Sequence, residues 1–303
     1  MWVKLSVHRV VYLTLVILSV FLIFTDNALY PVLFSEYVCS VAPCPTGARV
    51  GLRLLMLAAT FILNLLGIEI VGISSVIITA VTVFPFVAMF VIHLFSTGFY
   101  INWASLATIP SNVQWSAFIA TASWNLSGLE QAGAVAEDVR QPQHSILRAL
   151  LALLGLALVT YIPPVLTGVS TTDGPLRLEE WETGFWTQVA HGVGGNGLQM
   201  IMTLSSVVSA FGLTLSALCT TSHIIAGMAL TEAIPNPLRD YLARRHPRFQ
   251  THHYTITLNV ALTAVFSTCL DFGPLVMLDQ VLYGIRVVFI FLAFFACENF
   301  THT

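Results

Sequence analysis

Eight runs of mostly apolar residues constrain this chain most, because each is close to the roughly 20 residues that a helix needs to cross a bilayer. Inside a bilayer, only helices and closed barrels satisfy their own backbone polar groups. These runs predict an all-α, polytopic helical membrane protein of about eight transmembrane helices, with residues 1–303 forming a single transmembrane domain. The predicted spans are 10–34, 50–70, 73–97, 113–135, 146–170, 195–230, 254–271 and 275–297.

The composition supports this fold class and excludes several others. Hydrophobic residues make up 56% of the chain and charged residues only 9%, whereas a soluble domain averages about 45–50% and about 25%. So few charges cannot cover the surface of a soluble core of this size. Lys4 is the single lysine, so the chain also lacks the basic patch that nucleic-acid binding needs. The expected partners are the lipid bilayer and small molecules.

The basic residues predict how the chain is oriented in the membrane. Residues 238–253 carry four arginines, and positive charge accumulates in cytoplasmic loops. Counting spans outward from this loop places both ends of the chain and residues 140–148 on the same side, and the acidic 171–187 loop on the other. We therefore expect an integral protein of the plasma membrane with both termini in the cytoplasm.

The cysteines and histidines indicate no metal site and no cofactor. His93, His191 and His223 are scattered along the chain without the spacing of a ligand set. Cys39 and Cys44 share one hydrophilic loop. They can form a local disulfide if that loop faces an oxidising space, or remain two free thiols, and the sequence leaves both alternatives open.

The centre of the fourth span, Ser123–Glu130, is polar and weak in helix propensity. In one interpretation the helix unwinds here and lines a cavity, as the discontinuous helices of secondary transporters do. In the other, the helix is continuous and its polar side chains bond to neighbouring helices. Composition alone does not decide between the two.

Four segments resemble one family of transporters, in the order in which that family has them. Trp124–Arg148 contains W-N-x-x-G-x-E followed by A-E-D-V, and resembles the sixth helix of the amino acid–polyamine–organocation superfamily. The run DNALYPVLF at 26–34 resembles the third helix of the plant and kinetoplastid polyamine and amino-acid proton symporters. Residues 181–185 resemble the loop before that family's eighth helix, and 227–248 its eight-to-nine loop.

The resemblance implies a fold and an extent. The eight spans correspond to family helices three to ten, which implies a partial transporter fold of inverted five-helix repeats with one discontinuous helix. The chain is thus expected to be a fragment that lacks helix one, which carries the first half of the family's substrate site. Plant relatives carry an acid in helix ten near the place of Ile290, and Arg286 stands one turn earlier, which puts polyamine selectivity in question.

The resemblance also implies a function. We expect a secondary active transporter of amino acids or polyamines, coupled to protons and working by alternating access around the broken helix. The alternative is a truncated, non-transporting membrane protein derived from such a transporter. A membrane enzyme is not expected, because neither a G-x-S-x-G elbow nor an HExxH motif is present.

Five residues around the expected break carry the site hypothesis. Trp124 is similar to the aromatic gate of the superfamily, although a tryptophan there can also be a core residue. Asn125, Ser127 and Gly128 would offer side-chain and backbone contacts to substrate at the break. Glu130 would carry the coupling proton or hold an amine, because a carboxylate at this depth is costly when charged and unpaired. Its alternative is a structural acid bonded to a neighbouring helix.

Other candidates lie on other spans. Asp26 could be the counter-charge for a cationic amine, or could sit close to the outer surface. Ser205 and Ser209 could face the substrate cavity, or form a small-residue face for close helix packing. Asp279 and Arg286 are seven residues apart and share a helical face, which favours a structural ion network.

Overall fold

The structure is a computed structural model that describes residues 9–42, 44–101, 103, 113–127, 139, 141–171, 184–231 and 233–301. Within these ranges the regular structure consists of nine helices and no strand. The prediction of an all-α, polytopic helical membrane protein is therefore confirmed. The helices are α2 (Arg9–Val41), α3 (Thr46–Leu66), α4 (Ile68–Ser96), α6 (Trp115–Leu126), α7 (Pro142–Thr171), α8 (Phe185–Leu230), α9 (Leu238–Leu242), α10 (His253–Cys269) and α11 (Phe272–Thr301).

Each of the eight predicted spans overlaps mainly one helix, although 50–70 runs past the end of α3 into α4 and 113–135 continues beyond the described part of α6. Helix α9 lies in the loop between two of the spans. By length and composition, six described helices can cross a membrane: α2, α3, α4, α7, α8 and α11. Helix α10 has 17 residues, and the described part of α6 has 12. The sixth span begins earlier than expected, at Phe185 instead of residue 195, because α8 continues across a kink. Gly195 makes that kink with a φ of 67°, a conformation that glycine adopts at little cost.

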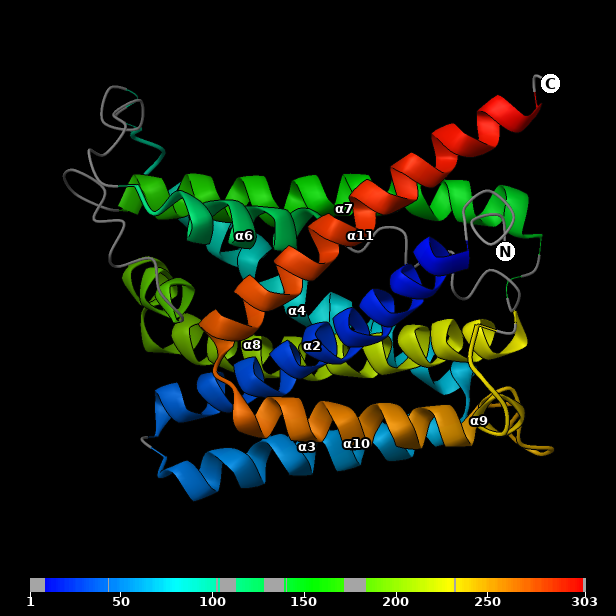
Figure 1. Cartoon of the computed structure of the whole chain (residues 1–303). Helices are drawn as coiled ribbons and strands as arrows, with labels where there is room; N and C mark the ends of the chain where they lie inside the picture. The colour runs from blue at the N-terminus through cyan, green and yellow to red at the C-terminus, as the bar shows by residue number, and fades with distance from the viewer. Residues whose placement is uncertain are drawn as a thin grey trace.

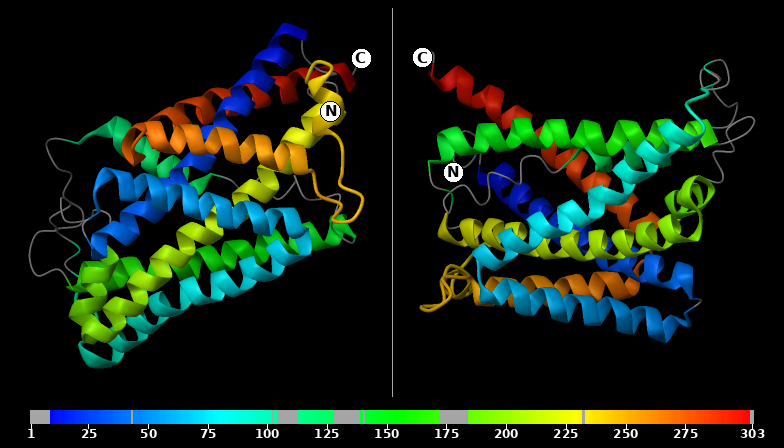
Figure 2. Two further views of the ribbon diagram at one scale, coloured as in Figure 1. Left: turned by 90° about the horizontal axis from the view of Figure 1, so that it is seen from below. Right: turned by 180° about the vertical axis from the view of Figure 1, so that it is seen from behind.

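Helices α2, α3, α8 and α10 all pack against one another, and the remaining long helices lie around them. Helix α11 packs on α2 and α6, and α4 packs on α8 and α7. Seen from behind in Figure 2, α4 crosses in front of α8. The start of α2, the end of α11 and the loop that contains α9 gather at one end of the bundle, on the right of Figure 1. This end is called the inner end below, and the end with the α2–α3 turn the outer end.

The core lies where α2 meets its neighbours, and much apolar surface lies outside it. Leu29 and Val32 of α2 are fully buried in one cluster with Met56 of α3 and Leu275 of α11. In contrast, only 11% of the most apolar 18-residue stretch of α4 is buried inside the protein, and only 6% of the corresponding stretch of α7. Such exposed apolar helix faces suit contact with lipid chains.

Helices α4 and α8 approach closely through small and hydroxyl-bearing residues. A Cβ atom at the buried Gly212 of α8 would overlap Cγ2 of Ile78 on α4. One turn away along each helix, the hydroxyls of Ser75 and Ser216 lie 3.0 Å apart. Small residues of this kind allow helix backbones to come close in a membrane, where van der Waals packing drives association.

A buried arginine ties α3 to α2, to α10 and to the loop before α11 at the outer end. Arg53 of α3 is only 5% exposed, and its Nε donates a hydrogen bond to Ser35 Oγ of α2 at 3.0 Å. Its guanidinium also donates to the backbone oxygen of Ser267, near the end of α10, and lies 3.9 Å from a carboxylate oxygen of Asp271. A positive charge at the carboxyl end of α10 also complements the helix dipole.

The two cysteines of the outer loop form a disulfide. Cys39, near the end of α2, is bonded to Cys44, just before α3. This decides between the two alternatives that the sequence left open. The bond closes the short turn between α2 and α3.

Replacing Gly212 by alanine tests the close packing of α4 on α8. We expect Gly212→Ala to lower the thermal unfolding midpoint in detergent, because overpacking a tight contact costs about 1–3 kcal/mol. Gly227→Ala on the same helix is the matched control, since its Cβ would meet nothing within 4 Å. Ile78→Ala should restore the midpoint in the Gly212→Ala background. Equal midpoints for the two glycine variants would contradict the packing.

Candidate functional site

The described part of α6 ends inside the stretch where the sequence predicts a break. Its last helical residue is Leu126, and Ser127 has an extended backbone with φ −87° and ψ 169°. The Ser127 hydroxyl donates back to the carbonyl oxygen of Trp124 at 2.9 Å, which caps the helix end. Two of the predicted site residues, Gly128 and Glu130, lie outside the described residues.

Trp124 lies between α6 and α11. Its half-buried indole meets the ring of Phe272 edge to face, with the ring centroids 5.8 Å apart. It also packs against the core cluster that contains Leu29 and Val276. A side chain placed at this junction can form part of the core and also cover a site at the end of α6, so its role as a gate stays a prediction.

Asn125 faces α7. Its carbonyl oxygen accepts a hydrogen bond from the Tyr161 hydroxyl at 3.1 Å, and its side-chain oxygen lies 3.4 Å from the same hydroxyl. The Asn125 amide donates to the carbonyl oxygen of Thr121, one turn earlier on α6. The tyrosine thus satisfies a backbone carbonyl that the end of α6 leaves without a helical partner.

The two serines of α8 lie away from this helix end. Ser205 is 2% exposed and its hydroxyl donates to the carbonyl oxygen of Thr82 on α4 at 3.2 Å. Ser209 is half-buried one turn further along α8. The hydroxyl of Ser205 therefore belongs to the α4–α8 interface.

Asp26 belongs to a polar cluster that connects α2 with α11. Its Oδ1 accepts from the Tyr30 hydroxyl at 3.0 Å. On α11, Asp279 is 2% exposed and accepts from the Thr25 hydroxyl at 3.1 Å and from the Gln280 amide at 3.0 Å. The sequence analysis placed Asp279 with Arg286 in a structural ion network and did not connect it with α2. The signal it missed is that the first and last spans each carry an acid well inside an apolar run.

A second buried cluster connects α2 with α8 and α10 through amides and hydroxyls. The Asn27 amide donates to Thr221 Oγ1 and to Asn259 Oδ1, both at 2.9 Å. The Asn259 amide in turn donates to Thr221 Oγ1 at 2.8 Å and to Ser222 Oγ at 3.3 Å. Hydrogen bonds between membrane helices contribute about 0.6–2 kcal/mol each, so this cluster fixes α2 against both neighbours.

A cavity of about 360 Å³ opens between α2, α8 and α11 in the inner half of the bundle. Its walls are mostly apolar, and Arg286 of α11 is the charged side chain among them. The guanidinium lies over the ring of Tyr283, 5.5 Å from its centroid. The lining residues are Tyr12, Leu15, Val16, Ser19, Gly227, Met228, Thr231, Arg286 and Ile290.

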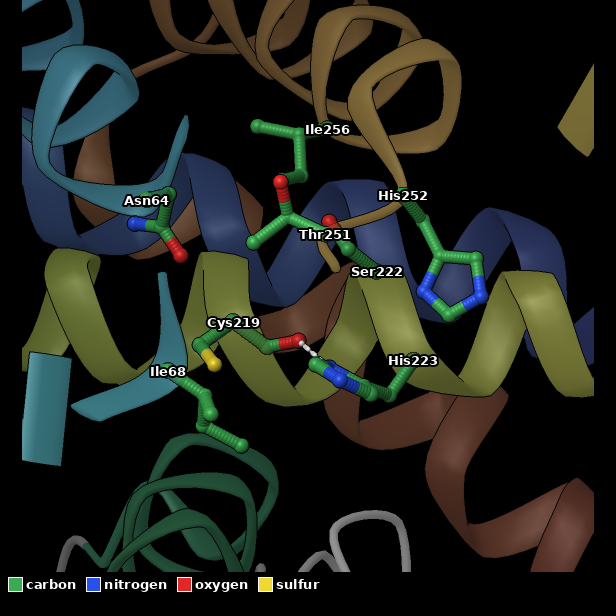
Figure 3. A pocket seen from close by; sticks show the side chains of 8 residues that line it. All are labelled: Asn64, Ile68, Cys219, Ser222, His223, Thr251, His252 and Ile256. Carbon is green, nitrogen blue, oxygen red and sulfur yellow. Dashed lines mark hydrogen bonds between the residues drawn. The ribbon is translucent and has the colours of Figure 1, made fainter. Parts of the chain in front are cut away.

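A much smaller cavity lies between α3, α8 and the start of α10, and Figure 3 shows its lining. Its volume of about 10 Å³ gives room for a single water molecule at most. His223 on α8 donates a hydrogen bond from Nδ1 to the carbonyl oxygen of Cys219 at 2.8 Å, and its ring meets the ring of His252 edge to face, with the centroids 5.5 Å apart. Among the described residues, no group of three or more possible ligand side chains could hold a metal ion.

The loop before α10 is held by stacked rings. The imidazoles of His246 and His253 lie nearly parallel with centroids 4.3 Å apart. Nδ1 of His246 accepts backbone N–H groups from Arg248 and Phe249, so that nitrogen carries no proton. Burial, and then the neighbouring His246, lower the pKa of the His253 imidazole. The stack therefore favours a neutral His253 ring.

Comparisons with known proteins identify a matching family and several relatives. A family model described as amino acid permease matches residues 1–298. The chain is 28% identical over 274 residues to a protein named "probable polyamine transporter" from Arabidopsis thaliana, covering 89% of this chain and 52% of the relative. It is 28% identical over 273 residues to polyamine transporter RMV1 from Arabidopsis thaliana and 27% identical over 275 residues to polyamine transporter PUT1 from Oryza sativa subsp. japonica. These matches cover 89% of this chain, and 54% and 49% of the two relatives. The chain thus spans about half the length of the curated relatives it matches.

Acidification should loosen the loop before α10. Because folding lowers the pKa of His253, the stabilisation from its neutral ring is present above the ordinary histidine value of about 6.5. It is lost as the pH falls through the lowered value in the folded protein. We expect hydrogen exchange of residues 244–252 to be faster at about pH 5.5 than at about pH 7.5, after correction for intrinsic rates.

Phenylalanine at position 253 keeps a stacking ring without a titrating group. His253→Phe should therefore remove most of the pH dependence of exchange in the loop. His191→Phe, at an exposed position of α8, is the matched control and should leave it intact. A loop that exchanges with the same pH dependence in the His253→Phe variant would show that the stack does not control it.

Proposed function

The chain belongs to the amino acid permease family, whose model matches residues 1–298, and from this membership we propose that it forms part of a proton-coupled secondary transporter. The substrate is a small molecule, an amino acid or a polyamine, and transport proceeds by alternating access around a broken helix. The observation that carries the proposal is the end of the α6 hydrogen-bond ladder at Leu126, inside an apolar run. An interrupted helix at membrane depth exposes backbone groups that can bind substrate.

In this proposal the end of α6 provides the substrate contacts. Trp124 covers the substrate, while Asn125, Ser127 and Gly128 present polar groups at the break. The position of Trp124 against Phe272 supports a gate whose closure depends on α6 and α11 together. The Tyr161 hydroxyl already donates a hydrogen bond to the carbonyl oxygen of Asn125. A substrate that binds Asn125 would therefore bind a residue that Tyr161 also contacts.

Two further helices complete the proposed site. Asp26 on α2 offers negative charge to a cationic group of the substrate, and the Tyr30 hydroxyl orients its carboxylate. On α8, Ser209 is a better candidate than Ser205, since the Ser205 hydroxyl already donates to α4. Glu130 carries the coupling proton, because protonation is the cheapest way to neutralise a carboxylate in the membrane.

We also propose that the protein lies in the plasma membrane with both chain ends in the cytoplasm. The arginine-rich loop at 239–248 lies at the same end of the bundle as the start of α2 and the end of α11 (Figure 1), which supports this orientation. Cysteines placed in that loop should react with an impermeant reagent only after the cells are opened. Labelling in intact cells would reverse the orientation.

A second candidate is a membrane protein that shares the fold but does not transport by itself. The observation that favours it is the extent of the match, since the chain covers about half of each relative's length. Radiolabelled uptake distinguishes the two candidates when the 303-residue chain is expressed alone and beside a full-length relative. Uptake by the chain alone above background would exclude the second candidate.

Neutralising Glu130 tests its role in proton coupling in a full-length protein that contains this chain. Glu130→Gln mimics the protonated acid permanently, so we expect concentrative uptake driven by a pH gradient to collapse while substrate exchange persists. Uptake and exchange of radiolabelled substrate are measured in the same vesicles. If the variant still accumulates substrate with unchanged pH dependence, Glu130 has a structural role.

Removing the indole of Trp124 tests the gate in the same protein. An aromatic ring on a cation contributes about 0.5–2 kcal/mol, so Trp124→Ala should raise the apparent KM about 2- to 30-fold. Trp115→Ala is the matched control, because that indole is 58% exposed on the same helix. Equal effects of the two substitutions on KM would assign Trp124 to packing alone.

A further inference from the structure

We propose that the loop containing α9, residues 233–252, binds the headgroups of anionic phospholipids through Arg244 and Arg248. The partner is a lipid of the surrounding bilayer whose headgroup carries a net negative charge, such as phosphatidylglycerol. This binding is separate from the proposed transport, since neither the substrate contacts nor the coupling proton takes part in it. It can therefore be tested whether or not the chain transports.

The loop lies against the end of a helix that can cross a membrane. The Thr251 hydroxyl donates to the carbonyl oxygen of Leu65, in the last turn of α3, at 3.4 Å. Helix α3 is long and apolar enough to span a bilayer. Figure 1 and the right panel of Figure 2 show the loop extending beyond the ends of α3 and α10. The loop is therefore placed where the bilayer meets water.

Burial and hydrogen bonds hold the loop in place. Leu242 of α9 is 3% exposed and lies in one apolar cluster with Ile225 of α8. Its carbonyl oxygen accepts from the Thr255 hydroxyl of α10 at 2.9 Å. Further along, the backbone N–H of His246 donates to the carbonyl oxygen of Thr251 at 2.9 Å. A loop that is fixed in this way loses little conformational freedom when its side chains bind a partner.

The loop carries an excess of positive charge. Residues 238–253 contain four arginines and one acid, Asp240. Asp240 pairs with Arg239, with 3.2 Å between Oδ1 and Nε. Arg244 and Arg248 are both exposed. Each can meet a headgroup separately, so the proposal needs no contact between the two.

Arginine suits a phosphate headgroup by its geometry. Its planar guanidinium carries N–H donors along its edge, and two of them can bind two phosphate oxygens in parallel. The guanidinium of Arg248 lies over the ring of Phe249, 5.4 Å from the centroid. The ring covers one face of the group and leaves the donors at its edge for a headgroup. Each arginine near an anionic membrane surface raises the affinity about fivefold.

Exposed amphipathic side chains near the arginines favour a membrane lipid over a soluble partner. Tyr241 of α9 and Tyr254 of α10 are 54% and 50% exposed, and their rings meet edge to face with centroids 5.7 Å apart. Leu238, at the start of α9, is 48% exposed. Tyrosine is enriched at the headgroup level of membranes. An anionic bilayer offers negative phosphate beside apolar chains, which matches this combination of side chains.

Native mass spectrometry of the 303-residue chain tests the binding. The chain is released from detergent micelles with increasing phosphatidylglycerol, and the bound lipids are counted. We expect Arg244→Gln and Arg248→Gln each to weaken the apparent affinity about fivefold, and the double variant about 25-fold. Arg49→Gln is the matched control, because Arg49 is exposed on α3 at the outer end and should leave the affinity unchanged. Equal affinities of the loop variants and the control would overturn the site.

Hydrogen exchange in lipid nanodiscs tests the place of binding. At one fixed pH, residues 243–250 should exchange more slowly in nanodiscs with phosphatidylglycerol than in nanodiscs of phosphatidylcholine alone. The double glutamine variant should lose this difference. Its side chains are changed only at exposed positions, and a size-exclusion profile like that of the parent chain establishes that it is folded. Nanodiscs expose both faces of the bilayer, so the result does not depend on the proposed orientation.

The remaining outcomes separate a membrane lipid from other partners. Inorganic phosphate added to phosphatidylcholine nanodiscs should not slow exchange in the loop. Equal protection by free phosphate would overturn a lipid as the partner, because the phosphate group alone would then be enough. Equal exchange in the two lipid compositions would also overturn the proposal and leave the arginines to a soluble acidic protein. Failure of the chain to transport would change none of these results.

Discussion

Helix α2 is fixed by polar contacts that are buried on two of its faces, and the positions of the other helices depend on it. In a bilayer, apolar side chains do not drive helices together as they do in water, because lipid is equally apolar. Specific hydrogen bonds and close packing must therefore choose the neighbours. Thr25 binds α11, Asn27 binds α8 and α10, and Ser35 binds Arg53 of α3.

The sequence predicted the six helices that are long and apolar enough to cross a membrane, because bilayer thickness sets the length of each apolar run. It missed the start of α8, where Gly195 allows the helix to continue across a kink. It also left the state of Cys39 and Cys44 open, because pairing depends on loop geometry that a short hydrophilic segment does not reveal. Hydrophobic periodicity and composition are properties of one helix at a time. They therefore predicted that a helix is present more reliably than they predicted where it begins and ends.

The candidate site was predictable only in part, for a related physical reason. The polar stretch near Asn125 marked the end of α6, because polar groups and weak helix formers at membrane depth are costly unless the backbone is used. The contact of Thr25 with Asp279 joins residues 254 positions apart. No local pattern indicates that the first and last spans are neighbours. Two acids in separate apolar runs were the only available signal, and only the folded structure shows which helices are neighbours.

The two polar faces of α2 differ in the kind of polar group that they carry. The cluster around Asn27, Thr221 and Asn259 contains only amides and hydroxyls, so its hydrogen bonds do not change between pH 5 and pH 8. The face toward α11 carries two carboxyl groups, and its energy depends on their charge. The contacts of α2 with α8 and α10 therefore hold throughout this pH range, whereas its contact with α11 also depends on groups that can carry charge.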